Sequence, residues 1–161
     1  IGEYFTEMLD QSMSWSDAEK LCAEWGGHFA LKGIMSVEDA KRAVDIGCTG
    51  IMVSNHGGRQ LDGSCASFDQ LSAIVDAVGD KIDVICEGGI QRGTHVLKAL
   101  ATGAKACSGG RLYLYALAGA GQQGVERALE ILRTEIERDM KLMGCRSISE
   151  LNRSHLRYRR S

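Results

Sequence analysis

The amino-acid sequence predicts an α/β fold built on one parallel sheet, and three observations support this. Short apolar runs alternate four times with segments of helical period, and a helix is the usual crossover between two parallel strands. The apolar runs are nearly continuous, as expected of strands that are covered on both faces. The chain has 161 residues, which is too few for two independent cores.

The four predicted strands are short apolar runs bounded by glycine or polar residues, at 29–32, 50–53, 82–86 and 105–108. In parallel α/β proteins, active residues gather where strands end and loops begin. The loops after these strands begin at Lys32, Ser54, Glu87 and Gly109. We therefore expect the chemistry to lie in these loops.

Five helices are predicted from apolar positions at helical spacing, over residues 17–25, 36–46, 67–78, 94–101 and 125–143. Ser16, Ser36 and Ser67 are the expected N-terminal caps of the first three, because a serine oxygen can accept the free N–H groups of a first turn. Gly103 is expected to end the fourth helix.

The composition excludes several classes of protein. Lys and Arg number 19 against 21 for Asp and Glu, giving a net charge of −2, so the chain is not a broadly basic nucleic-acid binder. No stretch approaches the about 20 consecutive apolar residues of a membrane span, and the first residues do not resemble a signal peptide. We expect a cytoplasmic protein without an integral membrane segment.

The six cysteines are interpreted as free thiols. None of them forms a C-x-x-C pair, and four lie within or beside apolar runs. Burial as small apolar residues is therefore favoured over disulfides, redox chemistry or metal ligation. This agrees with a reducing cytoplasm, and no metal site is predicted.

The loop at residues 54–62, Ser-Asn-His-Gly-Gly-Arg-Gln-Leu-Asp, is the most informative. Glycines beside His56 allow a sharp turn that exposes the imidazole, and Arg59 follows three residues later. An imidazole can accept a proton near neutral pH, and a guanidinium can bind a carboxylate through two parallel hydrogen bonds. The pair suits proton abstraction from an acid whose reacting carbon adjoins the carboxyl group. These residues alone leave a purely structural role equally open.

Two further loops predict a phosphate site. Residues 87–93, Glu-Gly-Gly-Ile-Gln-Arg-Gly, run from a strand into a helix, and Ser-Gly-Gly-Arg follows the next strand at 108–111. Glycine-rich turns at helix N-termini offer unpaired N–H groups and the positive end of the helix dipole to a phosphate. Two such turns in succession, each followed by an arginine, indicate a phosphorylated cofactor.

Several motifs in register resemble one family, the FMN-dependent enzymes that oxidise α-hydroxy acids. The motifs are Lys32-Gly-Ile, the 54–62 run, Gly88-Gly-Ile, Lys98-Ala-Leu, Gly110-Arg111, Leu114-Tyr-Ala-Leu and Met140-Lys-Leu-Met-Gly144. The family includes respiratory L-lactate dehydrogenases, glycolate oxidases and mandelate dehydrogenases. The resemblance covers nearly the whole chain and implies units five to eight of a (β/α)8 barrel, which takes about 250 residues when complete.

The resemblance also implies a function and its residues. FMN would oxidise a small L-2-hydroxy acid, with L-lactate first, to the 2-oxo acid. His56 would be the base, Arg59 would bind the substrate carboxylate, and Lys32 would lie near the flavin ring. The residues implied to bind the cofactor are Lys32, Ser54, Glu87, Gly88, Gly89, Gln91, Arg92, Gly110 and Arg111.

The sequence departs from the family pattern at three of these loop positions. Glu87 stands where the family usually has Asp, and Gln91 stands where an arginine usually binds the phosphate. Arg92 is the expected substitute for that missing charge. His95 replaces a position that is often acidic and is interpreted as an exposed histidine at the start of a helix.

We expect one C-terminal half-barrel domain over residues 1–161. It comprises a lead-in and helix at 1–27, four βα units at 28–145 and a C-terminal helix or tail at 146–161, whose arginine-rich end at 153–160 is expected to be solvated.

An open half-barrel leaves unpaired strand edges and an uncovered inner face. The candidate residues on that face are Leu31, Met52, Ile85 and Cys107. We therefore predict a homodimer or larger assembly. Two alternatives to an active enzyme remain open, which are a half-barrel that binds FMN or phosphate without catalysis and a folded fragment without ligand.

Overall fold

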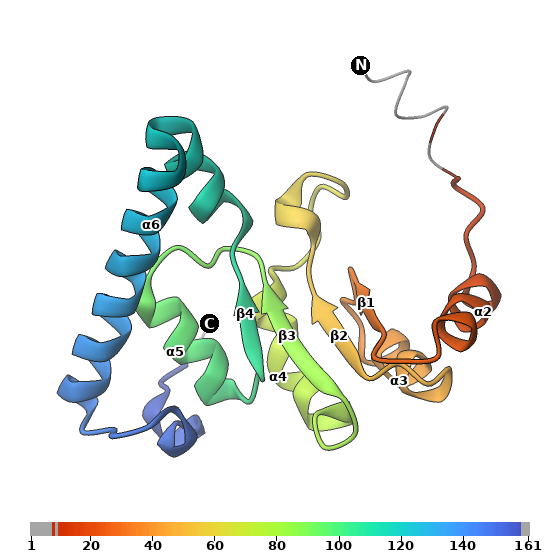
Figure 1. The fold of residues 1–161 in the computed structure, drawn as a ribbon. Coiled ribbons are helices and arrows are strands. Elements are labelled where there is room, and N and C mark those ends of the chain that lie inside the picture. Colours follow the sequence, from red (N-terminus) through yellow and green to blue (C-terminus); the bar gives the residue numbers. More distant parts are fainter. Residues whose placement is uncertain (1–7, 9, 159–161) are drawn as a thin grey trace.

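The computed structural model describes residues 8 and 10–158, and the fold within them is a four-stranded parallel sheet. The strands are β1 (Ala30–Lys32), β2 (Gly50–Val53), β3 (Asp83–Glu87) and β4 (Ala106–Ser108). They lie in the order β1-β2-β3-β4, and each pairs in parallel with the next (Figure 1). This confirms the predicted α/β fold with four βα units.

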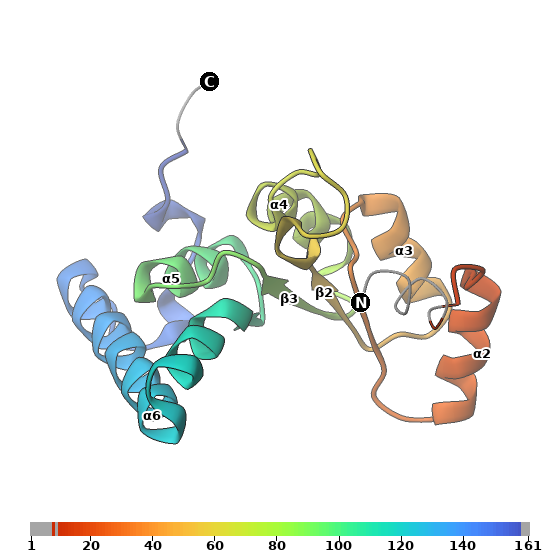
Figure 2. The same ribbon diagram turned by 90° about the horizontal axis from the view of Figure 1, so that it is seen from above.

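The helices are α2 (Trp15–Trp25), α3 (Val37–Asp45), α4 (Ser67–Val78), α5 (Gly93–Thr102) and α6 (Gly110–Met143). Short 3-10 turns are η1 (His56–Gly58), η2 (Ile148–Glu150) and η3 (Arg153–His155). Figure 2 shows α3 and α4 on the same side of the strands. Helix α5 packs beside them against β4, and α6 packs on the outside of α5.

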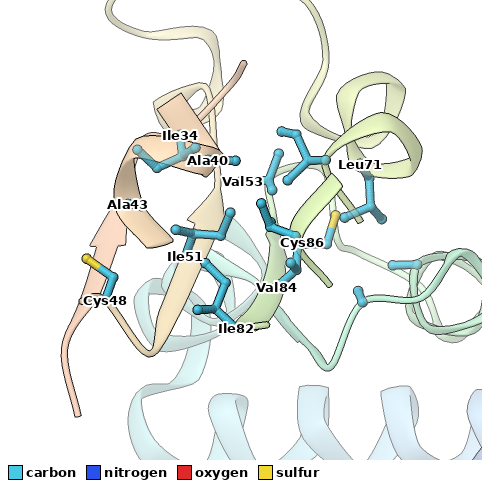
Figure 3. Packing of buried hydrophobic residues seen from close by; sticks show 14 of the residues in the cluster. Ile34, Ala40, Ala43, Cys48, Ile51, Val53, Leu71, Ile82, Val84 and Cys86 are labelled. Atoms are coloured by element: carbon cyan, nitrogen blue, oxygen red, sulfur yellow. The ribbon is translucent and has the colours of Figure 1, made fainter. Parts of the chain in front are cut away.

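The core lies between the sheet and these helices (Figure 3). Ile51 and Val53 of β2 and Cys86 of β3 are fully buried, and Leu71 of α4 packs in the same cluster. These strand residues alternate with half-buried ones on the opposite face, which is the period of two that a pleated strand imposes.

Two of the residues predicted for the inner face lie on the helix side instead. Leu31 is paired with Ile51, and Cys107 is paired with Cys86, and both pack against the buried core. Met52 and Ile85 are paired with each other on the opposite face, as predicted. Paired residues of a parallel sheet share a face, and a strand of three residues is too short for its own apolar pattern to reveal which face that is.

Two predicted helix caps are also wrong. The cap of α2 is Ser14, whose backbone N–H and hydroxyl both donate to Asp17, so the helix begins earlier than its apolar stripe indicates. Ser67 is the first residue of α4, and its hydroxyl accepts a hydrogen bond from the backbone N–H of Asn55 at 3.2 Å. Ser36 caps α3 by accepting from Asp39, as predicted.

Helix α6 is longer than the predicted helix at 125–143. It begins at Gly110 and has a break at Ala120 and Gly121, where the backbone leaves the helical region. The first part, 110–119, projects from the sheet at the upper left of Figure 1. Several glycines follow it closely in the sequence, and glycine is a poor helix former, so the pattern did not reveal it.

The described part of the C-terminal tail is mostly exposed, as expected, but one of its arginines anchors it to the helices. Arg153 forms an ion pair with Asp76 of α4 at 2.6 Å and donates to the carbonyl of Thr102 at 3.1 Å. The tail is thereby attached to the outer surface of α4 and α5. Arg159 and Arg160 lie outside the described residues.

All six cysteines are free, as predicted, although Cys65 is exposed. Burial raises the pKa of the Cys86 thiol to about 11 and that of the Cys107 thiol to about 12, so both stay protonated at neutral pH. The cytoplasmic location stays a prediction. In the part of the chain that the structure describes, no helix is long and apolar enough to cross a membrane.

Glu135 joins α6 to α5. Its carboxylate accepts hydrogen bonds from the guanidinium of Arg92 and, at 2.8 Å, from the backbone N–H of Gly93, the first residue of α5. A Cβ on Gly93 would lie 2.6 Å from the Cβ of Glu135, so glycine is needed for this close approach. The carboxylate takes the place of the side-chain cap that α5 lacks.

We predict that Glu135→Gln destabilises the protein in a pH-dependent way. Hydrogen bonding from Arg92 and then from Gly93 lowers the pKa of the Glu135 carboxyl below its usual value. The stabilisation is therefore complete above the unfolded pKa and is lost as the pH falls through the folded pKa. Urea unfolding should show a difference between wild type and Glu135→Gln at pH 7 that shrinks towards pH 3. Glu24→Gln, at an exposed position on α2, should show no such trend, and a constant difference for Glu135→Gln would contradict the prediction.

Candidate active site

A cavity of about 230 Å³ lies at the carboxyl ends of the strands, where the loops after β2, β3 and β4 meet. Its lining includes most of the predicted site residues, namely Lys32, His56, Arg59, Glu87, Gly88, Gly89, Gln91, Gly110 and Arg111. These come from segments far apart in the sequence. The parallel sheet brings them together because all its strands end at the same edge.

Three polar side chains connect the ends of three neighbouring strands beneath this cavity. The Lys32 ammonium donates to the Ser54 hydroxyl at 3.1 Å and lies 3.3 Å from the Glu87 carboxylate. The Ser54 hydroxyl in turn donates to Glu87. Ser54 is buried, and the Glu87 side chain is only 13% exposed. An opposite charge and a hydroxyl donor therefore satisfy the half-buried carboxylate.

His56 lies in a turn with an uncommon backbone. It has a φ of +55°, and Gly57 and Gly58 follow with φ of +71° and +73°. For a residue with a Cβ, this left-handed region is higher in conformational energy by roughly 1–2 kcal/mol. The backbone N–H of His56 donates to Ser54 at 3.1 Å, and the Asn55 side chain accepts from Gly57 at 3.1 Å. These bonds hold the turn and leave the imidazole exposed.

The His56 ring packs against the backbone of Gly33 at the end of β1. A Cβ at Gly33 would lie 3.0 Å from Cε1 of His56. Gly33 also has a φ of +96°. The glycine after Lys32 thus provides room for the imidazole, a role that the Lys-Gly-Ile motif did not reveal by itself.

Arg59 lines the same cavity as His56. The predicted pair of an imidazole and a guanidinium is therefore brought to one cavity rather than to opposite sides of the molecule. Arg59 is exposed, so its guanidinium is available to an anionic ligand. The catalytic roles of the two residues stay predictions.

The glycine turns that line the same cavity have the features of a phosphate site. At Gly89 and Gly110 a Cβ would meet no atom within 4 Å, so both backbones border open space. Helix α6 begins at Gly110 without a side-chain cap, and Arg111 adds a positive charge beside its first turn. Free N–H groups, a helix N-terminus and a guanidinium together suit a dianion.

Arg92 does not replace the charge that Gln91 lacks. Its guanidinium lies 2.6 Å from the Glu135 carboxylate, away from the cavity that Gln91 lines. The loop has an interaction that the sequence did not reveal, because Nδ1 of His95 lies 2.9 Å from the carbonyl of Gly89 and 3.3 Å from the backbone nitrogen of Gln91. His95 thus supports the glycine turn from α5.

Helix α6 adds two apolar residues to the cavity, Leu112 and Leu114. The sequence motif Leu114-Tyr-Ala-Leu marked this segment but did not indicate that it borders the site. The sequence did not predict a helix over 110–119, and it is this part of α6 that places the two leucines at the cavity.

Comparisons with known proteins agree with this geometry. Residues 1–158 match the family model described as FMN-dependent dehydrogenase. A pre-mycofactocin synthase from Mycobacterium tuberculosis is 50% identical over 94% of this chain and 38% of its own length. An L-lactate dehydrogenase from Caulobacter vibrioides is 44% identical over 92% of this chain and 39% of its own length.

The fold has solved counterparts. A mutant of the (S)-mandelate dehydrogenase from Pseudomonas putida superposes with a TM-score of 0.90, at 36% identity, over 94% of this chain and 43% of the other. The chain thus spans about two fifths of the length of the curated relatives it matches. Its sheet corresponds to part of a larger barrel.

We predict that Gly33→Ala displaces the His56 imidazole. The added methyl group would lie 3.0 Å from Cε1 of His56, which is closer than carbon atoms pack without strain. The ring resonances of His56 in a histidine-edited NMR spectrum should shift. Gly63→Ala is the matched control, because Gly63 also has a positive φ, of +76°, but a Cβ there meets nothing within 4 Å. Both variants should lose roughly 1–2 kcal/mol of stability, and unchanged His56 resonances in Gly33→Ala would refute the contact.

Proposed function

Because the chain belongs to the FMN-dependent dehydrogenase family, we propose that its cavity holds FMN and serves the oxidation of a small L-2-hydroxy acid. L-Lactate is the first candidate, and its product would be the 2-oxo acid. The names of the relatives include an L-lactate dehydrogenase and a peroxisomal (S)-2-hydroxy-acid oxidase. They differ in substrate, so the acid is chosen here by chemical class.

One observation carries the proposal. His56 and Arg59 line the same cavity as Lys32, Arg111 and the glycine turn at 88–89. The proposed base, the proposed carboxylate-binding group and the proposed phosphate-binding turns thus line one cavity. A purely structural role for the 54–62 loop does not account for an exposed imidazole in a left-handed turn at the cavity wall.

The residues at the cavity fit FMN. The backbone N–H groups near Gly89 and Gly110, with the guanidinium of Arg111, would hold the phosphate. Lys32 would hold the flavin ring through its ammonium group, which is half-exposed beside Glu87. When bound, FMN supplies a two-electron acceptor for the substrate.

The chain's own residues would then handle the substrate and its protons. Arg59 would bind the substrate carboxylate through paired N–H donors. This would orient the carbon that bears the hydroxyl group toward His56. The imidazole would accept a proton from the substrate, as a general base whose ordinary pKa lies near neutrality can do. Oxidation removes two protons and two electrons from the hydroxy acid. His56 would accept one proton, and FMN, when bound, would supply the acceptor for both electrons and for the second proton.

Self-association is part of the proposal. In the described part of the chain, β1 and β4 each have one strand neighbour, so each has an unpaired edge. Met52 and Ile85 lie on the sheet face away from the helix-covered core. The cavity of about 230 Å³ is also smaller than the about 300–1,000 Å³ of most small-molecule sites. A second copy would cover these edges and add a wall to the cavity.

The cofactor proposal predicts a flavin spectrum that responds to substrate. Protein reconstituted with FMN should retain the yellow colour after gel filtration, and anaerobic L-lactate should bleach it. His56→Ala should retain the colour and lose the bleaching by at least about 100-fold in rate. Glycolate and mandelate, tested in parallel, would identify the preferred acid.

The alternatives give different results in the same experiment. Flavin that binds but is not bleached by any of the three acids would indicate a binding module without catalysis. Protein that remains colourless with excess FMN would indicate a folded fragment without ligand. Bleaching that persists in His56→Ala would exclude His56 as the base.

Self-association predicts a species of at least twice the chain mass in light scattering at micromolar concentration. Ile85→Lys should shift this species toward the monomer, because a buried unpaired ammonium group at the interface is costly. Leu142→Lys is the matched control, at a position on α6 that is 80% exposed, and it should leave the mass unchanged. A sharp monomer peak for the wild type would contradict the prediction.

A further inference from the structure

The turn that carries His56 is held by hydrogen bonds from its own segment and by one from far away. His56, Gly57 and Gly58 donate their backbone N–H groups to Ser54 and Asn55, which directly precede them. Among the described residues, the hydrogen bond that reaches this turn from another element comes from Arg111. Nη2 of its guanidinium donates to the carbonyl of Gly57 at 3.0 Å.

The guanidinium lies close against this backbone. A Cβ at Gly57 would be 2.9 Å from Nη2 of Arg111 and 3.5 Å from its Cζ. Gly57 therefore meets two requirements at once, a positive φ of +71° and the close approach of a side chain 54 residues away. The positive φ disfavours a larger residue, and a Cβ at this position would also push the guanidinium away from the carbonyl.

The left-handed backbone of His56 is disfavoured without such a restraint, whereas Gly57 and Gly58 adopt a positive φ freely. The backbone of His56 is in a region that a residue with a Cβ seldom occupies. A local turn of this kind can open easily when only neighbouring residues hold it. A charge-assisted hydrogen bond to its carbonyl favours the observed conformation over more extended ones.

We propose that Arg111 is a positioning residue for His56, in addition to its proposed role at the phosphate. This inference rests on the proposed function for the identity of His56 as the base. A guanidinium has five N–H donors in a planar fork, so Arg111 can hold the Gly57 carbonyl with one edge and a phosphate oxygen with another. The phosphate end of the cavity and the turn that carries the base are thereby linked through one side chain.

The proposed link couples phosphate binding to the order of the turn at 56–58, and this coupling can be measured. A phosphate bound at Gly110 would fix the guanidinium of Arg111, which lines the same cavity. A fixed guanidinium would in turn stabilise the left-handed turn, because the ordering of the side chain has already taken place. By linkage, the ordered turn would strengthen phosphate binding by the same factor.

The decisive variant is Arg111→Lys, measured without cofactor. Lysine keeps the positive charge but lacks the planar fork that reaches the Gly57 carbonyl. Hydrogen exchange of the amides of 56–58 should become about tenfold faster than in wild type, while the amides of α4 and α5 keep their rates. The His56 ring resonances should shift as well. Arg127→Lys, at an exposed ion pair of α6, is the matched control and should change neither.

Inorganic phosphate provides the second arm. In wild type, added phosphate should slow exchange at 56–58, and in Arg111→Lys it should not. Exchange rates at 56–58 that are equal in wild type and Arg111→Lys would overturn the proposal, as would a phosphate effect that persists in the variant. Neither hydrogen-exchange experiment contains flavin. A failure to bind FMN would therefore contradict the proposed function without affecting the test of Arg111.

Discussion

The carboxylate of Glu87 connects the ends of three neighbouring strands, and the site is built on that connection. It accepts from Ser54 and pairs with Lys32, so the last residues of β1 and β3 and the first residue after β2 keep a fixed spacing. Ser54 also receives the backbone N–H of His56. The position of the proposed base therefore depends on a charge pair between the two strands that flank β2, and this network is partly buried, where such interactions are strong.

The two faces of the sheet have different physical roles. The face that carries Ile51, Val53 and Cys86 is sealed by α3, α4 and α5 and supplies the apolar burial that stabilises the fold. The opposite face carries Lys32 and Glu87 at its rim. The chain spans about two fifths of its relatives' length, and in a closed barrel this second face is interior. One face thus stabilises the fold, and the other carries the polar rim of the proposed site.

Much of the fold could be predicted because its signals are local. The four apolar runs and the helical periods between them predicted the parallel sheet, since each crossover is a helix. The strand order followed from the resemblance to four consecutive units of a barrel. The errors arose where a strand was too short to show an apolar alternation or where glycines obscured a helical pattern. Leu31 and Cys107 were assigned to the wrong face because three-residue strands have almost no alternation of their own. The first part of α6 was missed because the glycines at 119, 121 and 124 separate it from the predicted helix.

The sequence by itself determined which residues are chemically capable: an imidazole and a guanidinium in one short loop, and glycine turns at helix starts. Only the tertiary structure decided which of them meet. Arg92 was expected at the phosphate but pairs with Glu135, 43 residues along the chain, while Gly33 and His95 took supporting roles that no motif announced. The physical reason is that a residue's chemistry and local conformation depend on the residue itself and its sequence neighbours. Its contact partner depends on packing between elements that are distant in sequence.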